Sequence, residues 1–224
     1  MKGKIIATKN IAKDVMEYIV QIDTPIRFIP GQYVMLSFED KSKERRAYSI
    51  IQYDAMQRTI SLLVKIAGAF TQKLSKMSVN DELFVYGPYG KFTLRENRKI
   101  MFISGGIGVV PLYSMFLHML QTRNYNDIYF HYSCHYSNEM ALKDELGRIN
   151  LNNVHVKLYL TKEEPKSRFS IENVKTVKGF VDYDYYICGP EPMMDSIITE
   201  LKGVGVTDKN IHKESYILRG LSSN

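Results

Sequence analysis

The chain has 224 residues, of which 45% are hydrophobic and 24% charged, a composition that is typical of globular proteins and excludes gross disorder. Its formal net charge of +6 comes without any run of five or more basic residues, so nucleic-acid binding is disfavoured, whereas acidic partners are compatible. The two cysteines, Cys134 and Cys188, and the five histidines follow no ligand spacing, so we expect neither a disulfide framework nor a metal site.

The first hundred residues indicate a β domain. The start of the chain has no long apolar segment of the kind that directs secretion, so we expect a cytoplasmic protein. Short runs rich in β-branched and aromatic residues follow, separated by turn sequences such as TP, PG and GPYG. Their spacing predicts a small antiparallel barrel or sandwich, interrupted by one helix at residues 70–77. The predicted strands are residues 4–10, 17–23, 32–38, 47–53, 59–66 and 81–87.

After Arg98, strands alternate with helices, which predicts a parallel sheet covered on both faces. We place the junction near residues 95–99, which gives one domain over residues 1–97 and a second over residues 98–224. The predicted strands are residues 99–104, 127–133, 154–160, 182–189 and 210–216, and the helices are residues 112–120, 138–149 and 192–205.

One apolar segment needs separate treatment. Residues 100–120 carry no formal charge over about the length that spans a bilayer. The segment also holds three glycines and, in its middle, Pro111. We therefore interpret it as a buried strand, a glycine-rich turn and a helix, with a membrane span as the lesser alternative, and we expect no span.

Two glycine turns follow strands of the second domain. SGGIGVVP, residues 104–111, leads from strand to helix, where glycines and free N–H groups suit a pyrophosphate. Pro111 stands where the usual fingerprint has its third glycine, so a plain tight turn is an equal alternative. ICGPEPMM, residues 187–194, repeats the pattern. Cys188 at its strand end lies on the ligand side of the sheet, although a lone buried cysteine is usually a small hydrophobe.

Seven short stretches occur in order along the chain: FIPGQYVML, RAYSI, GAFT, GPYGKF, SGGIGVVP, YICGPEPMM and HKESY. Together, from near residue 25 to Tyr216 and across both domains, they resemble the ferredoxin–NADP reductase-like flavoprotein family. The resemblance implies an N-terminal all-β antiparallel Greek-key barrel that binds FAD. It also implies a C-terminal Rossmann-like α/β domain with a five-stranded parallel sheet that binds NADH or NADPH.

The resemblance assigns the flavin contacts. Arg46 of RAYSI would pair with the flavin phosphate, Tyr48 would pack on the flavin, and Ser49 would hydrogen-bond near the flavin N5. A strand with an incidental Arg–Tyr pair is the alternative. GAFT would hold the pyrophosphate, which favours FAD over FMN, or would only cap a helix. The flavin contacts so assigned are Arg46, Tyr48, Ser49, Ile50, Val64, Lys65, Gly68, Ala69, Phe70 and Thr71.

The nicotinamide nucleotide is assigned in the same way. The phosphates would lie along the first glycine turn and the nicotinamide beside the second, with Glu214 near the flavin–nicotinamide contact and Tyr216 covering the ring. Ser49, Cys188 and Glu214 are thereby the candidate catalytic residues. The nucleotide contacts are Gly105, Gly106, Ile107, Gly108, Cys188, Gly189, Pro190, Met193 and Tyr216.

The chain departs from the family pattern in several places. Val110 stands where relatives often have Thr or Ala, and His135 where many place an arginine at the adenosine end. No carboxylate suited to the ribose is visible there, and Arg168 is a candidate for a 2′-phosphate, so NADH versus NADPH stays open. The chain runs eight residues beyond Tyr216, to Asn224, which questions its stacking on the flavin.

These features predict an NAD(P)H-dependent flavoprotein reductase that passes electrons to an acceptor. A separate ferredoxin or flavodoxin, an oxygenase component or a small oxidant would fit, and the basic balance favours an acidic carrier. One alternative is an electron-transfer subunit of a larger dehydrogenase or hydrogenase without turnover of its own. Another is a non-catalytic nucleotide-binding module.

Overall fold

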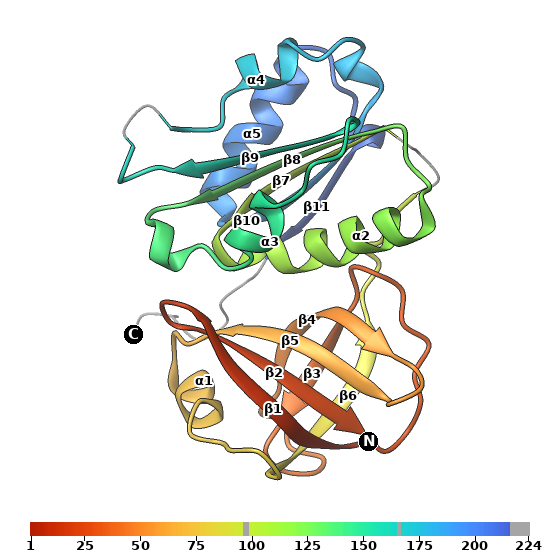
Figure 1. The fold of residues 1–224 in the computed structure, drawn as a ribbon, viewed down its shortest axis with the longest axis vertical. Helices are drawn as coiled ribbons and strands as arrows, with labels where there is room; N and C mark the ends of the chain where they lie inside the picture. The colour runs from red at the N-terminus through yellow and green to blue at the C-terminus, as the bar shows by residue number, and fades with distance from the viewer. Residues whose placement is uncertain (96–98, 165–166, 216–224) are drawn as a thin grey trace.

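The computed structural model describes residues 1–95, 99–164 and 167–215. They form two domains, one above the other in Figure 1. The strands that precede residue 90 make up the lower domain, and the sheet that starts at Lys99 makes up the upper one.

Six antiparallel strands close the lower domain into a barrel, in the order β1-β2-β5-β4-β3-β6. The prediction of a barrel or sandwich therefore resolves to a barrel, and its non-sequential strand order is the Greek key that the resemblance implied. Along β2, alternate residues Tyr18, Val20 and Ile22 are buried inside, as the period of a strand requires. The strands are β1 Lys2–Ala12, β2 Val15–Ile22, β3 Tyr33–Ser37, β4 Arg46–Asp54, β5 Thr59–Lys65 and β6 Glu82–Tyr89.

The single helix of the barrel domain is α1, Ala69–Leu74. It is shorter than the helix expected at residues 70–77. Phe70 and Leu74, four positions apart, form its buried face, which anchors one turn and a half of helix against the barrel.

The upper domain holds a five-stranded sheet in the order β11-β10-β7-β8-β9, with every neighbouring pair parallel. Helices α2 and α3 pack on one face, and α4 and α5 on the other. The strands are β7 Lys99–Gly105, β8 Asp127–Cys134, β9 Val154–Leu160, β10 Asp184–Gly189 and β11 Ile211–Ser215. The helices are α2 Val109–Thr122, α3 Lys143–Gly147, α4 Ile171–Lys175 and α5 Glu191–Gly203, with 3₁₀ turns η1 Gly106–Gly108, η2 Ser137–Glu139, η3 Phe180–Asp182 and η4 Asp208–Asn210.

The apolar segment at residues 100–120 is a strand, a turn and a helix, as expected: β7, η1 and most of α2. No helix in the described parts of the chain has the length and apolar character needed to cross a membrane.

The helix expected at residues 138–149 was wrong in extent. Only the 3₁₀ turn η2 and the five-residue helix α3 form there. Leu142 has a φ of 60°, a left-handed conformation that interrupts a right-handed helix. Met140, Ala141 and Leu142 are all buried, so the burial of these apolar side chains outweighs helix propensity.

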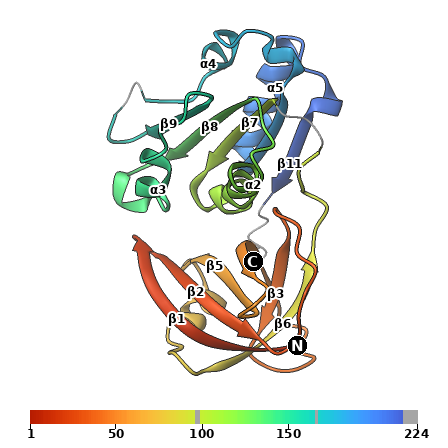
Figure 2. The same ribbon diagram turned by 45° about the vertical axis from the view of Figure 1, so that its right-hand side comes forward.

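The two domains share an apolar core. α2 lies along the underside of the sheet, facing β4 of the barrel (Figures 1 and 2). The Ser114 hydroxyl in α2 donates a 2.7 Å hydrogen bond to the carbonyl of Ile51 in β4, and both groups are buried. Val15, Leu63 and Phe92 of the barrel domain join Ile51 in the cluster built around α2. The contact fixes how the domains face each other.

Gly31 offers a test of this junction. Its φ is +99°, and a Cβ there would clash with the Phe92 carbonyl and the Met115 side chain of α2. We expect Gly31→Ala to lower the free energy of unfolding by about 2 kcal/mol or more, since strain and overpacking add. Urea denaturation followed by circular dichroism measures the change.

Gly203→Ala is the matched control, because Gly203 ends a helix and has open space around its Cβ position. We expect this change to be neutral or mildly stabilising. Equal effects of the two substitutions would contradict a tight junction at Gly31.

Candidate functional site

The stretch RAYSI opens β4 and meets α1. The Tyr48 and Phe70 rings stack with centroids 6.3 Å apart, and the Arg46 guanidinium lies 5.6 Å from the Phe70 centroid. Arg46 is half-buried and interacts weakly with exposed Glu44 at 3.7 Å. The structure thus brings together the two stretches, RAYSI and GAFT, that were predicted to hold one ligand.

The start of α1 leaves backbone open to solvent. Gly68 is the N-cap, and nothing lies within 4 Å of the position of a Cβ on it. The Thr71 hydroxyl accepts hydrogen bonds from the N–H groups of Ala67 and Gly68, at 2.9 and 3.0 Å. The helix-cap alternative is therefore realised, and it leaves room in front of Gly68 for a phosphate.

Two of the predicted flavin contacts have side chains that point into the barrel core. Ile50 and Val64 are fully buried in the barrel core, so only their backbone is available to a ligand outside the barrel. Ser49 is 3% exposed and pairs with Tyr33 across β3 and β4. Lys65, in contrast, is exposed at the end of β5.

Packing explains three of the glycines in the two turns. A Cβ on Gly108 would clash with the carbonyl of Cys188. A Cβ on Gly105 would lie 2.6 Å from the Met193 sulfur, and one on Gly189 would lie 2.6 Å from the Met193 methyl. These glycines allow β7, β10 and α5 to approach closely, and Met193 packs between the two turns.

Gly106 differs from its neighbours. Its φ is +54°, and nothing lies within 4 Å of its Cβ position. The 3₁₀ turn that it begins packs against β5 of the barrel. Burial raises the pKa of the Cys134 thiol, and the Gly106 backbone and the Lys65 charge partly lower it again. The first glycine turn therefore presents bare backbone at the junction of the domains.

Cys188 and Glu214 are direct neighbours in adjacent parallel strands. Cys188 is fully buried, and burial, followed by the Glu214 charge, raises the pKa of its thiol. Burial also raises the pKa of Glu214 to about 7. Two of the three candidate catalytic residues thus lie side by side, Cys188 fully buried and Glu214 half-buried. Lys91, Phe92, His212, Lys213 and Glu214 line a hollow of about 340 Å³.

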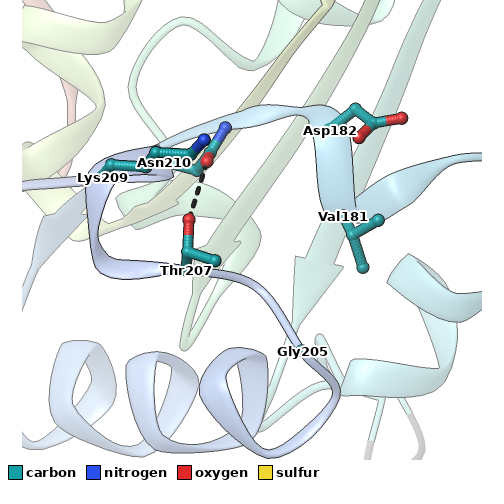
Figure 3. A pocket seen from close by; sticks show the side chains of 6 residues that line it. All are labelled: Val181, Asp182, Gly205, Thr207, Lys209 and Asn210. Atoms are coloured by element: carbon teal, nitrogen blue, oxygen red, sulfur yellow. Dashed lines mark hydrogen bonds between the residues drawn. The ribbon is translucent and has the colours of Figure 1, made fainter.

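A second hollow, of about 350 Å³, lies at the opposite ends of the strands, where β10 and β11 begin. Figure 3 shows its lining around Thr207 and Asn210, whose side chains are joined by a 2.9 Å hydrogen bond. These residues precede β11, and Asp182 precedes β10. Ligands of open α/β sheets bind at the carboxyl ends of the strands, so this hollow is not the predicted site.

The ends of β8 and β9 carry a hydrogen-bonded group that joins the predicted His135 to three residues that sequence reasoning missed. His135 Nδ1 lies 3.0 Å from the Thr161 hydroxyl. Ser137 donates from its N–H and its hydroxyl to one carboxylate oxygen of Glu163, at 2.7 and 2.9 Å. The two turns lie 26 residues apart in the chain, so only the adjacency of β8 and β9 could have revealed the group.

The other predicted nucleotide contacts are placed as follows. Pro190 is exposed at the N-cap of α5, and Ile107 is half-buried in η1. Val110 is buried in the first turn of α2. Arg168 is exposed shortly after β9, and Tyr216 lies outside the described residues.

Comparison with known proteins identifies the two domains. The family model of the oxidoreductase FAD-binding domain matches residues 2–94. The model of the oxidoreductase NAD-binding domain matches residues 102–198. The chain therefore belongs to the ferredoxin–NADP reductase-like flavoproteins, and the open backbone at Gly68 and Gly106 fits their two dinucleotides.

Individual relatives agree with this class. The chain is 30% identical over 206 residues to the reductase component of propane 2-monooxygenase from Rhodococcus jostii, covering 84% of this chain and 55% of that protein. It is 27% identical over 215 residues to the probable electron transfer subunit of dihydroorotate dehydrogenase B from Thermococcus kodakarensis, covering 95% and 83%. The chain thus spans little more than half of the first relative.

A solved structure shares the fold. The ferredoxin NADP+ reductase from Neisseria gonorrhoeae, solved with bound FAD and NADP, superposes with a TM-score of 0.83 at 17% identity. The match covers 96% of this chain and 98% of that one.

The raised pKa of Glu214 makes stability depend on pH. An unfolded glutamate has a pKa of 4.5, and the folded value is about 7, so the folded state holds the proton more tightly. The tighter binding of the proton stabilises the folded state. This contribution is fully present below the unfolded pKa and is lost as pH rises through about 7. Relative to Glu214→Gln, which cannot ionise, we expect the wild-type chain to be equally stable near pH 4 and about 1 kcal/mol less stable near pH 8.

Urea denaturation at several pH values measures this difference. Glu164→Gln serves as the control, because Glu164 is exposed in the turn after β9 and its removal should leave the pH profile unchanged. If the difference in unfolding free energy between the wild-type chain and the Glu214→Gln variant stays constant with pH, the Glu214 pKa is not raised.

Proposed function

We propose that the chain is an NAD(P)H-dependent FAD reductase. The observation that carries this proposal is the junction of the two domains, where the open Gly106 turn packs against β5, the strand that ends at Lys65. When bound, the nicotinamide supplies hydride to the flavin, and the flavin releases electrons to an acceptor. The protein contributes binding, orientation and exclusion of water. We propose that the domain boundary falls between residues 97 and 98.

On the barrel side, the proposed roles follow from position. Arg46, beside α1, pairs with phosphate through its planar guanidinium. The bare backbone at Gly68 admits a second phosphate group close to N–H donors. Tyr48 offers a flat apolar surface for the ring system, and Ser49 a hydroxyl at the strand mouth.

On the nucleotide side, the bare backbone of Gly106 leaves room for the pyrophosphate. Cys188 and Glu214 are proposed to border the nicotinamide. A carboxyl with a pKa near 7 can donate a hydrogen bond when protonated and accept one when ionised, so it can hold or release a proton near neutral pH. The buried thiol of Cys188 stays neutral and supplies a small, polarisable wall.

The acceptor is proposed to be a separate one-electron carrier or an oxygenase component. The likeness to a monooxygenase reductase component and the net charge of +6 support an acidic protein partner, steered by long-range attraction. Action in the cytoplasm stays a prediction.

Anaerobic reduction tests the proposal. The purified chain is loaded with FAD and mixed with NADH or NADPH while the flavin absorbance is followed. We expect at least one nucleotide to bleach it. A chain that binds no FAD, or a flavin that neither nucleotide bleaches, would reject the reductase.

Arg46 allows a sharper test of the flavin site. Arg46→Ala should weaken FAD binding roughly ten- to a hundredfold, because a charge-assisted phosphate contact contributes about 1.5–3 kcal/mol. Equilibrium dialysis or flavin fluorescence measures the dissociation constant.

Arg45→Ala is the matched control. The Arg45 guanidinium instead lies 3.7 Å from the Tyr86 centroid, and its Nε donates to the Ser42 carbonyl. An equal loss of FAD affinity in both variants would show that overall charge, not the Arg46 contact, is responsible.

A second candidate is an electron-transfer subunit without turnover of its own. The match to such a subunit from Thermococcus kodakarensis over 83% of its length favours it. Size-exclusion chromatography of the native protein from its host separates the two candidates. A stable complex with a larger dehydrogenase supports the subunit, whereas a lone chain that reduces acceptors supports the reductase.

A further inference from the structure

The order of strands in the sheet fixes where the adenosine end of a bound dinucleotide must lie. β7, with the pyrophosphate turn, is the middle strand of β11-β10-β7-β8-β9. Cys188 and Glu214, at the reacting end, belong to β10 and β11 on one side. Since neighbouring strands are about 4.8 Å apart, the other half of the nucleotide extends over the ends of β8 and β9.

A preformed polar group occupies those two ends. Its members are the pair His135–Thr161 and the pair Ser137–Glu163. Both hydrogen bonds from Ser137 go to the same oxygen of Glu163, Oε1. Among the described residues no donor reaches Oε2, so this oxygen remains available to accept hydrogen bonds from a ligand.

The turn that supports Ser137 is braced by the barrel. The N–H of Lys13, in the turn between β1 and β2, donates a 2.7 Å hydrogen bond to the carbonyl of Asn138. The Lys13 ammonium lies 4.0 Å from the carboxylate of Glu139. On the other side, the N–H groups of Glu163 and Glu164 bond to the Leu160 carbonyl. Both turns are therefore held before any ligand arrives.

We propose that Glu163 is the residue that makes this chain select NADH over NADPH; the inference rests on the proposed function. A carboxylate with a free oxygen accepts hydrogen bonds from the 2′- and 3′-hydroxyls of a ribose. It repels a 2′-phosphate, which carries negative charge and replaces the 2′-hydroxyl donor. Ser137 is the positioning residue that orients the carboxylate.

Lys162 and Arg168, among the described residues of the segment that follows β9, are cations that compete with the proposed selection. The Lys162 ammonium lies 5.7 Å from the centroid of the Tyr136 ring, on the neighbouring turn. Arg168 is exposed beyond β9. A site for a 2′-phosphate would depend on Arg168, so the experiment includes this residue.

The test measures binding directly. The FAD-loaded chain is titrated by calorimetry with ADP-ribose and with 2′-phospho-ADP-ribose, which differ only in the 2′-phosphate. We expect ADP-ribose to bind about tenfold more tightly, a difference of about 1.4 kcal/mol. Glu163→Gln should reduce this ratio to about threefold or less, and Ser137→Ala should reduce it partly.

Glu164→Gln is the matched control, because it removes the same charge one residue further along the same exposed turn. The Glu164→Gln variant should keep the wild-type ratio of affinities for ADP-ribose and 2′-phospho-ADP-ribose. Equal effects of the Glu163 and Glu164 substitutions would overturn the proposal, since long-range charge alone would explain them.

Two further results would also overturn the proposal. One is tighter binding of the phosphorylated ligand that Arg168→Ala abolishes. The other is binding of neither ligand, which would show that the chain has no site for the ADP-ribose half of the nucleotide. Because no hydride transfer is measured, these outcomes are distinct from failure of the flavin-bleaching assay, which bears on the reductase itself.

Discussion

The packing of α2 against the barrel is the contact on which the rest of the molecule depends. The glycine turn lies at the N-terminus of α2, and the same helix buries apolar side chains against β4. The buried hydrogen bond from Ser114 to Ile51 adds direction to this packing, because a hydrogen bond fixes orientation where apolar contact alone does not. Moving α2 would therefore move the turn relative to the strand mouth that holds Tyr48.

The glycines of the two turns serve different needs. At Gly105, Gly108 and Gly189 a Cβ would overlap neighbouring protein atoms, so the lack of a side chain there serves packing. Gly106 alone among the four combines a positive φ with open space. Pro111, which replaces the third glycine of the usual fingerprint, sits in the first turn of α2, where its missing N–H costs nothing. The fingerprint can thus be broken without loss of the turn.

The sequence predicted most of the fold because the strands are strongly patterned. The alternating burial of Tyr18, Val20 and Ile22 follows from the two-residue period of a strand with one buried face, and the continuous apolar run of β7 follows from burial on both faces of the sheet. The helix expected at residues 138–149 failed because Leu142 adopts a left-handed conformation to bury its side chain. Local propensity contains no information about that burial, which depends on the sheet beneath.

The candidate site was predictable where its residues are close in sequence and hidden where they are not. RAYSI and the glycine turns could be found from short motifs, but the pairing of Cys188 with Glu214 needs the parallel register of β10 and β11. The Ser137–Glu163 pair needs the adjacency of β8 and β9. A sheet order places distant turns together, and a single sequence does not encode that order in any local pattern.

Two glutamates at opposite edges of the sheet, Glu214 in β11 and Glu163 after β9, show how the environment of a carboxylate sets its chemistry. Glu214 is half-buried beside Cys188, and burial raises its pKa to about 7, which makes protonation near neutral pH accessible. Glu163 is exposed, and two donors from Ser137 orient it, which favours an acceptor with a fixed direction. The first arrangement suits a group that exchanges a proton, and the second suits a group that recognises hydroxyls. The same residue type therefore differs in character between the two positions, because burial dominates around Glu214 and hydrogen bonding dominates around Glu163.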